Sequence, residues 1–226
     1  MKRSVSLLTL ALLCAPVPVS HATGHLDLGA PGRTAEEKER DKFNKPDDLY
    51  AFWDVKAGDT VIDFIPSEGY NTYLLSQLVG PKGKVLAVGT YNYEKLQERL
   101  KANPLPNVKQ YKREELSSIP DDSVDVIVTV RNYHDLQPEV LGKLLAELRR
   151  VLKPGGVLGV VDARADKGRD IPNHRIADDV IKTEITAAGF RLEGTSEMLA
   201  NKSDDHSKPN WEQRYGLDQS CFKFVK

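Results

Sequence analysis

The sequence predicts an α/β domain built on a mostly parallel sheet of seven strands, with helices on both faces. Short apolar runs rich in β-branched residues, bounded by glycine and proline, have the pattern of buried strands. Segments with helical spacing alternate with these runs, and this alternation produces crossover connections between parallel strands. The chain has 226 residues, a length that suits one domain with a full hydrophobic core.

Each predicted element is bounded by turn or stop signals. The strands are expected over residues 60–64, 84–88, 108–111, 124–130, 157–161, 190–193 and 220–225. The helices between them are expected over residues 71–79, 93–101, 138–152 and 175–188. The third of these helices runs into Lys153-Pro-Gly-Gly156, a typical helix stop. Ligands of such sheets lie at the carboxyl ends of the strands, where the functional residues are therefore sought.

Residues 1–22 have the pattern of a cleaved secretory signal. A basic Lys2-Arg3 pair precedes an apolar run over 4–13, and small residues stand before the expected cleavage after Ala22. The run is shorter than the roughly 20 residues that span a bilayer. We expect a periplasmic or secreted protein without stable membrane insertion after cleavage. The alternative is a buried N-terminal helix.

The rest of the chain is expected to form a linker and one domain. Residues 23–33 contain two glycines and a proline without periodicity, which is typical of a linker. The domain spans 34–226 and begins with a helical extension over 34–55. Thr34, followed by acidic residues, marks the start of its first helix, and Pro46 begins a second, short one.

Composition excludes several classes of partner. The formal net charge is −1, and no strongly basic segment suited to nucleic acid or anionic lipid is present. Removal of the leader would leave Cys221 as the one cysteine, so we expect no internal disulfide and interpret Cys221 as a small buried residue. No pair of cysteines or histidines has zinc-ligand spacing, and no metal is expected.

Four segments, in order and at normal spacing, resemble the motifs of class I S-adenosylmethionine (SAM) methyltransferases. They are residues 61–70, 81–88, 119–128 and 148–158, of which the last, LRRVLKPGGVL, is the most specific. The chain also resembles a group of predicted, exported bacterial methyltransferases at Arg131-Asn-Tyr-His-Asp135, Val161-Asp162 and 187–190. The resemblance implies a Rossmann-like sheet with an antiparallel last strand, SAM as cofactor and a small-molecule substrate.

The resemblance also implies where the amino-acid end of SAM binds. The residues concerned are Asp63, Ile65, Glu68, Gly69 and Tyr70. In the family an acid ends the first strand, and a glycine-rich turn lets the backbone approach the cofactor. Here Pro66, Ser67 and Glu68 replace much of the glycine, and Glu68 adds a negative charge. Asp63 either binds the cofactor or caps the following turn.

The ribose and adenine ends are expected beside the second, third and fourth strands. Gly89 and Thr90 stand where the family has an acid that binds both ribose hydroxyls. A single threonine hydroxyl binds the ribose more weakly than a carboxylate does. Tyr91 or Tyr93 either stacks on the adenine or packs ordinarily. Glu114 or Glu115 either contacts the adenine amino group or belongs to an ordinary exposed pair of charged residues.

Three polar residues that follow the fourth strand are candidates for substrate chemistry. Arg131 either binds a carboxylate or forms a surface salt bridge. His134 is suited to remove a proton from a methyl acceptor near neutral pH, and Asp135 either assists it or caps the helix that begins near Pro138. After the fifth strand, Asp162 is a candidate ligand for a substrate group or a small cation.

Two hypotheses of function follow. The first is a SAM-dependent methyltransferase that acts on an unknown small molecule. The second is a non-catalytic exported ligand-binding protein with a degenerate methyltransferase fold. The altered glycine turn, the missing ribose acid and the expected export away from cytoplasmic SAM favour the second, whereas the otherwise intact motifs favour the first. The polar segment 201–216 is either a lid or simple surface.

Overall fold

The computed structural model describes residues 26–89, 93–213 and 215–226. The predicted signal over 1–22, Thr90 and Tyr91 lie outside these residues. Among the helices of the described ranges, none combines the length and the apolar character that crossing a bilayer requires.

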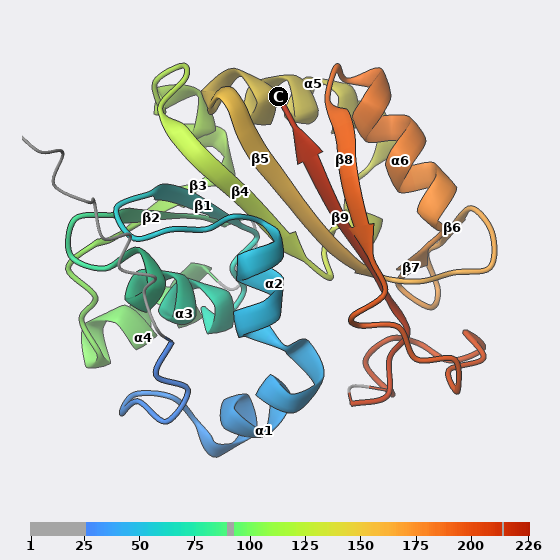
Figure 1. Cartoon of the computed structure of the whole chain (residues 1–226), viewed down its shortest axis with the longest axis horizontal. Helices are drawn as coiled ribbons and strands as arrows, with labels where there is room; N and C mark the ends of the chain where they lie inside the picture. Colours follow the sequence, from blue (N-terminus) through green and yellow to red (C-terminus); the bar gives the residue numbers. More distant parts are fainter. Residues whose placement is uncertain (1–25, 90–92, 214) are drawn as a thin grey trace, which may run out of the picture.

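The main sheet has seven strands in the order β3-β2-β1-β4-β5-β9-β8 (Figure 1). They are β1 (Thr60–Phe64), β2 (Lys84–Gly89), β3 (Val108–Lys112), β4 (Val124–Val130), β5 (Leu152–Ala163), β8 (Arg191–Ser196) and β9 (Gln219–Val225). The last strand, β9, is antiparallel to both neighbours, and the pairs from β3 to β5 are parallel. The predicted fold class is confirmed.

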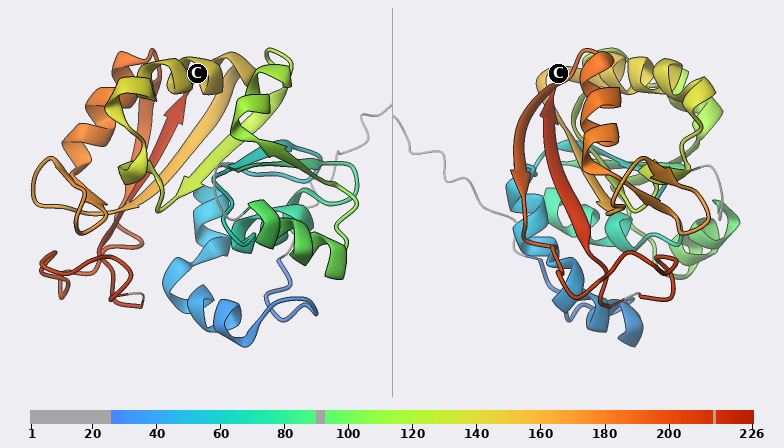
Figure 2. Two further views of the ribbon diagram at one scale, coloured as in Figure 1. Left: turned by 180° about the vertical axis from the view of Figure 1, so that it is seen from behind. Right: turned by 90° about the vertical axis from the view of Figure 1, so that its right-hand side faces the viewer.

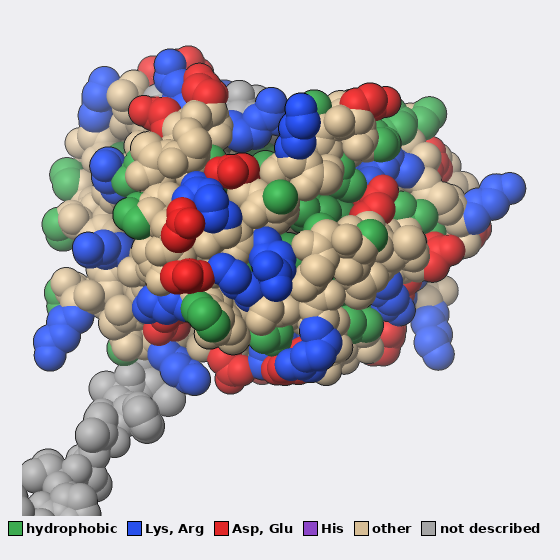
Figure 3. All heavy atoms as spheres, turned by 90° about the horizontal axis from the view of Figure 1, so that it is seen from above, with side chains coloured by type: hydrophobic (Ala, Val, Ile, Leu, Met, Phe, Trp, Pro, Cys, Tyr) green, Lys and Arg blue, Asp and Glu red, His purple; other side chains and the backbone are tan. Residues whose placement is uncertain are grey.

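Six α-helices in the described residues cover the two faces of this sheet. They are α1 (Ala35–Asn44), α2 (Pro46–Phe52), α3 (Tyr70–Val79), α4 (Tyr93–Ala102), α5 (Pro138–Val151) and α6 (Asp178–Ala187). Helices α1 to α4 lie on one side, and α5 and α6 on the other (Figures 1 and 2). Strand β1 shows the alternation: Val61 packs with α2 and α3, whereas Ile62 and Phe64 pack with α5 and α6. The surface over α5 and α6 carries interspersed acidic and basic side chains (Figure 3).

The predicted helix over 175–188 is wrong at its start. Helix α6 begins at Asp178 after the N-cap Ala177, because the first two residues of the predicted helix form β7 (Arg175–Ile176), which pairs with β6 (Arg169–Asp170). Tertiary contacts outweigh the local helical pattern here. The fully buried Arg175 guanidinium lies 3.0 Å from Asp204 Oδ2 and ties this hairpin to the polar segment before β9.

The N-terminal helices dock where α3 begins. Helix α1 starts with a capping box, in which the hydroxyl of Thr34 accepts from the N–H of Glu37 and the Glu37 carboxylate accepts from the N–H of Thr34. Asp41 of α1 accepts a 2.7 Å hydrogen bond from the hydroxyl of Tyr70. After α2, the buried Trp53 donates its indole N–H to the carbonyl of Phe222, at 2.9 Å. These contacts attach α1 to the start of α3, and the end of α2 to strand β9 of the sheet.

Candidate active site

The turn after β1 keeps a glycine-like backbone although most of its glycines are absent. Ile65, Ser67 and Gly69 have φ angles of 63°, 51° and 88°. A left-handed conformation costs about 1–2 kcal/mol for a residue with a side chain, and it is especially uncommon for a β-branched one. Such strain persists where the surroundings demand the geometry. The turn therefore has left-handed backbone at alternate residues, a conformation that glycine adopts without strain.

Asp63, the penultimate residue of β1, is a carboxyl group buried beside this turn, with 1% of its surface exposed. The hydroxyl of Thr72 donates to its Oδ2 at 2.6 Å. Burial raises the pKa of Asp63 to about 7, although hydrogen bonds from Thr72 favour the charged form. A cationic group bound here would stabilise the carboxylate, which suits the ammonium of an amino acid.

The side chains of Ile65, Glu68 and Tyr70 do not place a charge at the carboxyl ends of the strands. The Glu68 carboxylate pairs with Lys95 on α4, at 2.7 Å, and its side chain is 64% exposed. The negative charge of Glu68, which was expected beside the cofactor carboxylate, therefore lies against Lys95 of α4. Ile65 is buried in the core, and the Tyr70 hydroxyl binds Asp41.

Gly69 lets α4 approach the turn. A Cβ on Gly69 would lie 2.6 Å from Leu96 Cδ1, closer than real carbon atoms approach one another. A side chain at this position would force the end of the Leu96 side chain to move, and φ is also positive here. Gly69 therefore suits the close packing as well as the bend.

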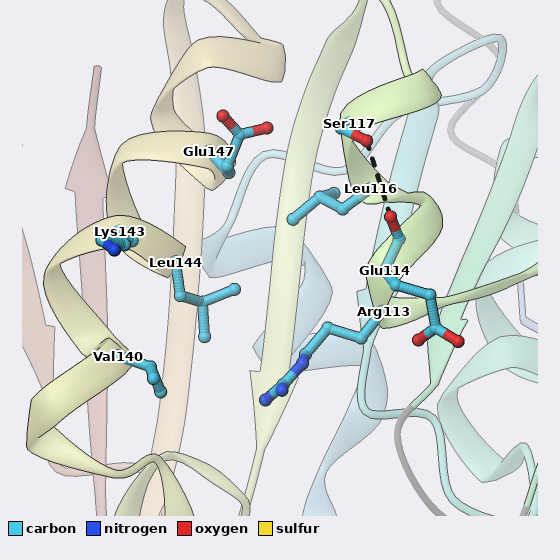
Figure 4. A pocket seen from close by; sticks show the side chains of 8 residues that line it. All are labelled: Arg113, Glu114, Leu116, Ser117, Val140, Lys143, Leu144 and Glu147. Atoms are coloured by element: carbon cyan, nitrogen blue, oxygen red, sulfur yellow. Dashed lines mark hydrogen bonds between the residues drawn. The ribbon is translucent and has the colours of Figure 1, made fainter.

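The residues expected at the other end of the cofactor are spread over several strands. Gly89 is buried at the end of β2 and pairs with Lys112 of β3. Glu114 lies exposed in the 3-10 helix η1 (Arg113–Ser118). It borders a groove of about 240 Å³ between η1 and α5, but its carboxylate points away from α5 (Figure 4). Arg131, with φ of 58°, donates its backbone N–H to the carbonyl of Val161 at the end of β4.

His134 and Asp162 form a buried pair at the ends of β4 and β5. His134 lies in the 3-10 helix η2 (Tyr133–Asp135), and its Nδ1 is 2.7 Å from Asp162 Oδ1. The backbone N–H of His134 donates to the other carboxylate oxygen at 2.8 Å. Burial alone would lower the pKa of His134, but the carboxylates of Asp162 and Asp135 outweigh burial and raise that pKa. The pair resembles the base and orienting acid of hydrolytic enzymes in its geometry alone.

Asp135 does not cap the next helix, which was one of its two predicted roles. The N-cap of α5 is Gln137, without a side-chain cap. The Asp135 carboxylate instead lies 3.1 Å from His174 Nδ1, and the same nitrogen is 3.1 Å from His134 Nε2. His174 comes from the turn between β6 and β7, with φ of 50°.

Sequence reasoning missed His174 as a partner of His134. The two histidines are 40 residues apart, so spacing carried no signal. The available signal was topological, since both residues follow neighbouring parallel strands and Asp162 was already a candidate. The structure thus brings together His134, Asp135, Asp162 and His174, whereas Asp63 and Gly69 belong to the adjacent strand end of β1.

Comparisons with known proteins place methyltransferases among the proteins that this chain is similar to. Residues 61–156, less than half of the chain, match the family model described as a methyltransferase domain. A curated arsenite methyltransferase of Halobacterium salinarum is 31% identical over 116 residues, which are 50% of this chain and 29% of that protein. The chain therefore spans under a third of this curated relative.

Solved structures share the fold over most of the chain. A SAM-dependent methyltransferase from Aquifex aeolicus has 25% identity and a TM-score of 0.65, covering 85% of this chain and 98% of that one. A Burkholderia thailandensis N-methyltransferase, solved with 1,6-didemethyltoxoflavin and S-adenosylhomocysteine, has 16% identity and a TM-score of 0.58, covering 85% and 78%. The chain is thus similar to a methyltransferase domain over residues 61–156 and to the Aquifex aeolicus methyltransferase over most of its length, and it shares the fold of the Burkholderia thailandensis protein.

Proposed function

We propose that this protein is a SAM-dependent methyltransferase that acts on a small-molecule acceptor. The observation that carries the proposal is the turn after β1, which keeps three left-handed residues although only Gly69 is a glycine. The buried Asp63 beside it supplies the acid that the motif requires. At the neighbouring strand ends, His134 and Asp162 add a proton-accepting pair.

The described residues fit the amino-acid end of SAM best. When bound, SAM supplies an electrophilic methyl group on a sulfonium. The carboxylate of Asp63 would hold the ammonium, because a buried carboxylate gains much from a cationic partner. Binding of the ribose by Gly89 and Thr90, of the adenine by Glu114 and of a carboxylate by Arg131 remains a prediction.

The acceptor is expected beside His134. Transfer of a methyl group to a hydroxyl or an amine releases a proton, and a nitrogen lone pair on an imidazole can receive it. Asp162 accepts the hydrogen bond from Nδ1–H, which leaves Nε2 as the receiving atom and stabilises the imidazolium that forms. Orientation of the acceptor against the methyl group would supply most of the remaining rate enhancement.

A calorimetric titration of the purified protein with SAM and with its demethylated product tests the proposal. We expect both to bind, and Asp63→Ala to weaken binding at least about tenfold, since a charge-assisted hydrogen bond is lost. Glu68→Gln is the matched control, because the Glu68 side chain faces Lys95 and should leave affinity unchanged. Absence of binding at high ligand concentration would contradict the proposal and favour a non-catalytic binding protein.

A second measurement separates chemistry from binding. We expect His134→Gln to lower turnover while cofactor affinity stays unchanged, because the proposal assigns His134 to the proton of the acceptor and not to the cofactor. Loss of cofactor binding in this variant would mean that His134 lies in the cofactor pocket instead.

We also propose that the protein acts outside the cytoplasm. The proposal is supported by the signal-like pattern over residues 1–22. Mass spectrometry of the protein from the periplasmic fraction should give a chain that begins at Thr23. Recovery of the uncleaved chain from the cytoplasm alone would contradict export.

A further inference from the structure

We propose that His134, His174 and Asp135 bind a divalent transition-metal cation such as zinc on the acceptor side of the site. The inference deepens the proposed function and rests on it for the identity of the acceptor. It goes against the sequence-based expectation of no metal, since the three ligands come from two separate loops. They are the one group of this kind that the described residues bring together.

The distances between the ligand atoms suit a single cation. His134 Nε2 lies 3.1 Å from His174 Nδ1 and 3.5 Å from Asp135 Oδ2, and His174 Nδ1 lies 3.1 Å from Asp135 Oδ1. Zinc bonds of about 2.0–2.1 Å in tetrahedral geometry separate neighbouring ligand atoms by roughly 3.3 Å. The observed separations bracket this value. The two histidine nitrogens therefore already have the separation that a single cation requires, and Asp135 approaches each histidine through a different carboxylate oxygen.

Asp162 orients the first of these ligands. Its carboxylate accepts the hydrogen bond from His134 Nδ1–H. The lone pair of His134 is therefore on Nε2, the nitrogen that faces His174 and Asp135. Metal-binding histidines characteristically donate their second ring N–H to a carboxylate in this way. Asp162 is itself fixed, because its oxygens also accept from the backbone N–H groups of His134 and Ala163.

His174 is held in position by groups outside the cluster. Its backbone carbonyl accepts from Asn210 Nδ2 at 2.7 Å, and its ring packs edge-on against Trp211 at a centroid distance of 5.0 Å. The left-handed backbone of His174, with φ of 50°, is a strained conformation that such contacts can maintain. In this arrangement His174 Nδ1 faces His134 Nε2 with no cation bound.

One side of the cluster is open to a further ligand. The His134 side chain is 2% exposed, whereas those of His174 and Asp135 are 38% and 39% exposed. Three protein ligands with an open position are typical of catalytic rather than structural zinc sites. Two histidines and one carboxylate are also a recurrent ligand set for divalent iron.

The cation would change how the acceptor loses its proton. A hydroxyl bound at the open position would release its proton to solvent, because a divalent cation lowers the pKa of bound oxygen. The resulting oxygen lone pair would form the new bond to the methyl carbon. The carbon–sulfur bond of SAM would break, and its electron pair would remain on the sulfur of S-adenosylhomocysteine. His134 would then be a ligand and not the proton acceptor.

The test is a calorimetric titration of chelator-treated protein with zinc chloride, without SAM. We expect one equivalent to bind. His174→Ala and Asp135→Asn, at partly exposed positions, should each weaken binding at least about tenfold, and Asp162→Asn about 10–100-fold. The matched control is His206→Gln, since both ring nitrogens of His206 already contact carboxylates of Asp166 and Asp218; it should leave the affinity unchanged.

Two outcomes would overturn the inference: no stoichiometric binding of zinc, or the same affinity in His174→Ala as in the wild type. Either would show that the cluster is a hydrogen-bonded group only. The proposed function is tested separately by titrating the cofactor in the presence of chelator. Cofactor binding without zinc binding would refute the metal site and leave the methyltransferase proposal standing.

Discussion

Asp63 makes the stability of this protein dependent on pH in a direction opposite to that of most carboxylates. Burial raises its pKa in the folded state from the ordinary value of 3.8 to about 7. Between these values the folded state binds more protons than the unfolded state, so the free energy of unfolding decreases as pH rises. The stability that protonated Asp63 contributes is complete below about pH 4 and is lost as pH rises through about 7.

The size of the effect follows from the shift. About three pKa units at about 1.4 kcal/mol each correspond to an upper value of about 4 kcal/mol. Asp63→Asn removes the titrating group and keeps the size of the side chain. The free energy of unfolding of the variant, minus that of the wild type, should therefore rise by up to about 4 kcal/mol between about pH 4 and pH 8.

Urea unfolding at a series of pH values measures this difference. Thr72→Val provides an internal check, because it removes the hydroxyl that donates to ionised Asp63 and should extend the loss of stability to higher pH. A difference between Asp63→Asn and the wild type that stays constant with pH would refute the reasoning. It would mean that Asp63 is solvated in the folded protein.

Three further substitutions test the architecture that positions the site. Ser67→Gly should raise the free energy of unfolding by about 1 kcal/mol, and the melting temperature by about 2–4 °C, since φ of 51° suits glycine; no change would place Ser67 in an unstrained turn. Gly159→Ala should lower the free energy of unfolding, measured with denaturant, by on the order of 3 kcal/mol, because its Cβ would lie 2.4 Å from the Trp53 ring. Wild-type stability would mean that Trp53, at the end of α2, does not pack against Gly159. Asp204→Ala should cost about 3–5 kcal/mol, since it leaves buried Arg175 without its carboxylate, and limited proteolysis should then cut within 201–216; an uncut segment of normal stability would contradict this ion pair.

Most of the fold could be predicted because its determinants are local. The run over 60–64 became β1 with the predicted bounds, and the alternation of strands and helices fixed the parallel sheet. Errors arose where tertiary contacts decide. Strand β5 extends from Leu152 to Ala163, partly because β9 pairs along it, and Arg175 leaves the helical pattern for its buried ion pair.

The candidate site was predictable only in part. Asp63 and Gly69 were named from the resemblance of residues 61–70 to a family motif, and His134 from its place after a predicted strand; all three lie at or near a carboxyl strand end. The left-handed backbone of Ile65 and Ser67 was not, because residue type alone opposes it. Asp135 was given a possible capping role because Pro138 follows, but its carboxylate faces His174, a contact that sequence spacing does not reveal.

The central claim is that SAM binds where β1 and β4 end, and hydrogen–deuterium exchange with and without S-adenosylhomocysteine tests it most directly. We expect slower exchange of the backbone amides of residues 63–72 and 130–135 when the ligand is present, with no change over β8. Unaltered exchange at 63–72, or protection confined to another part of the chain, would contradict it.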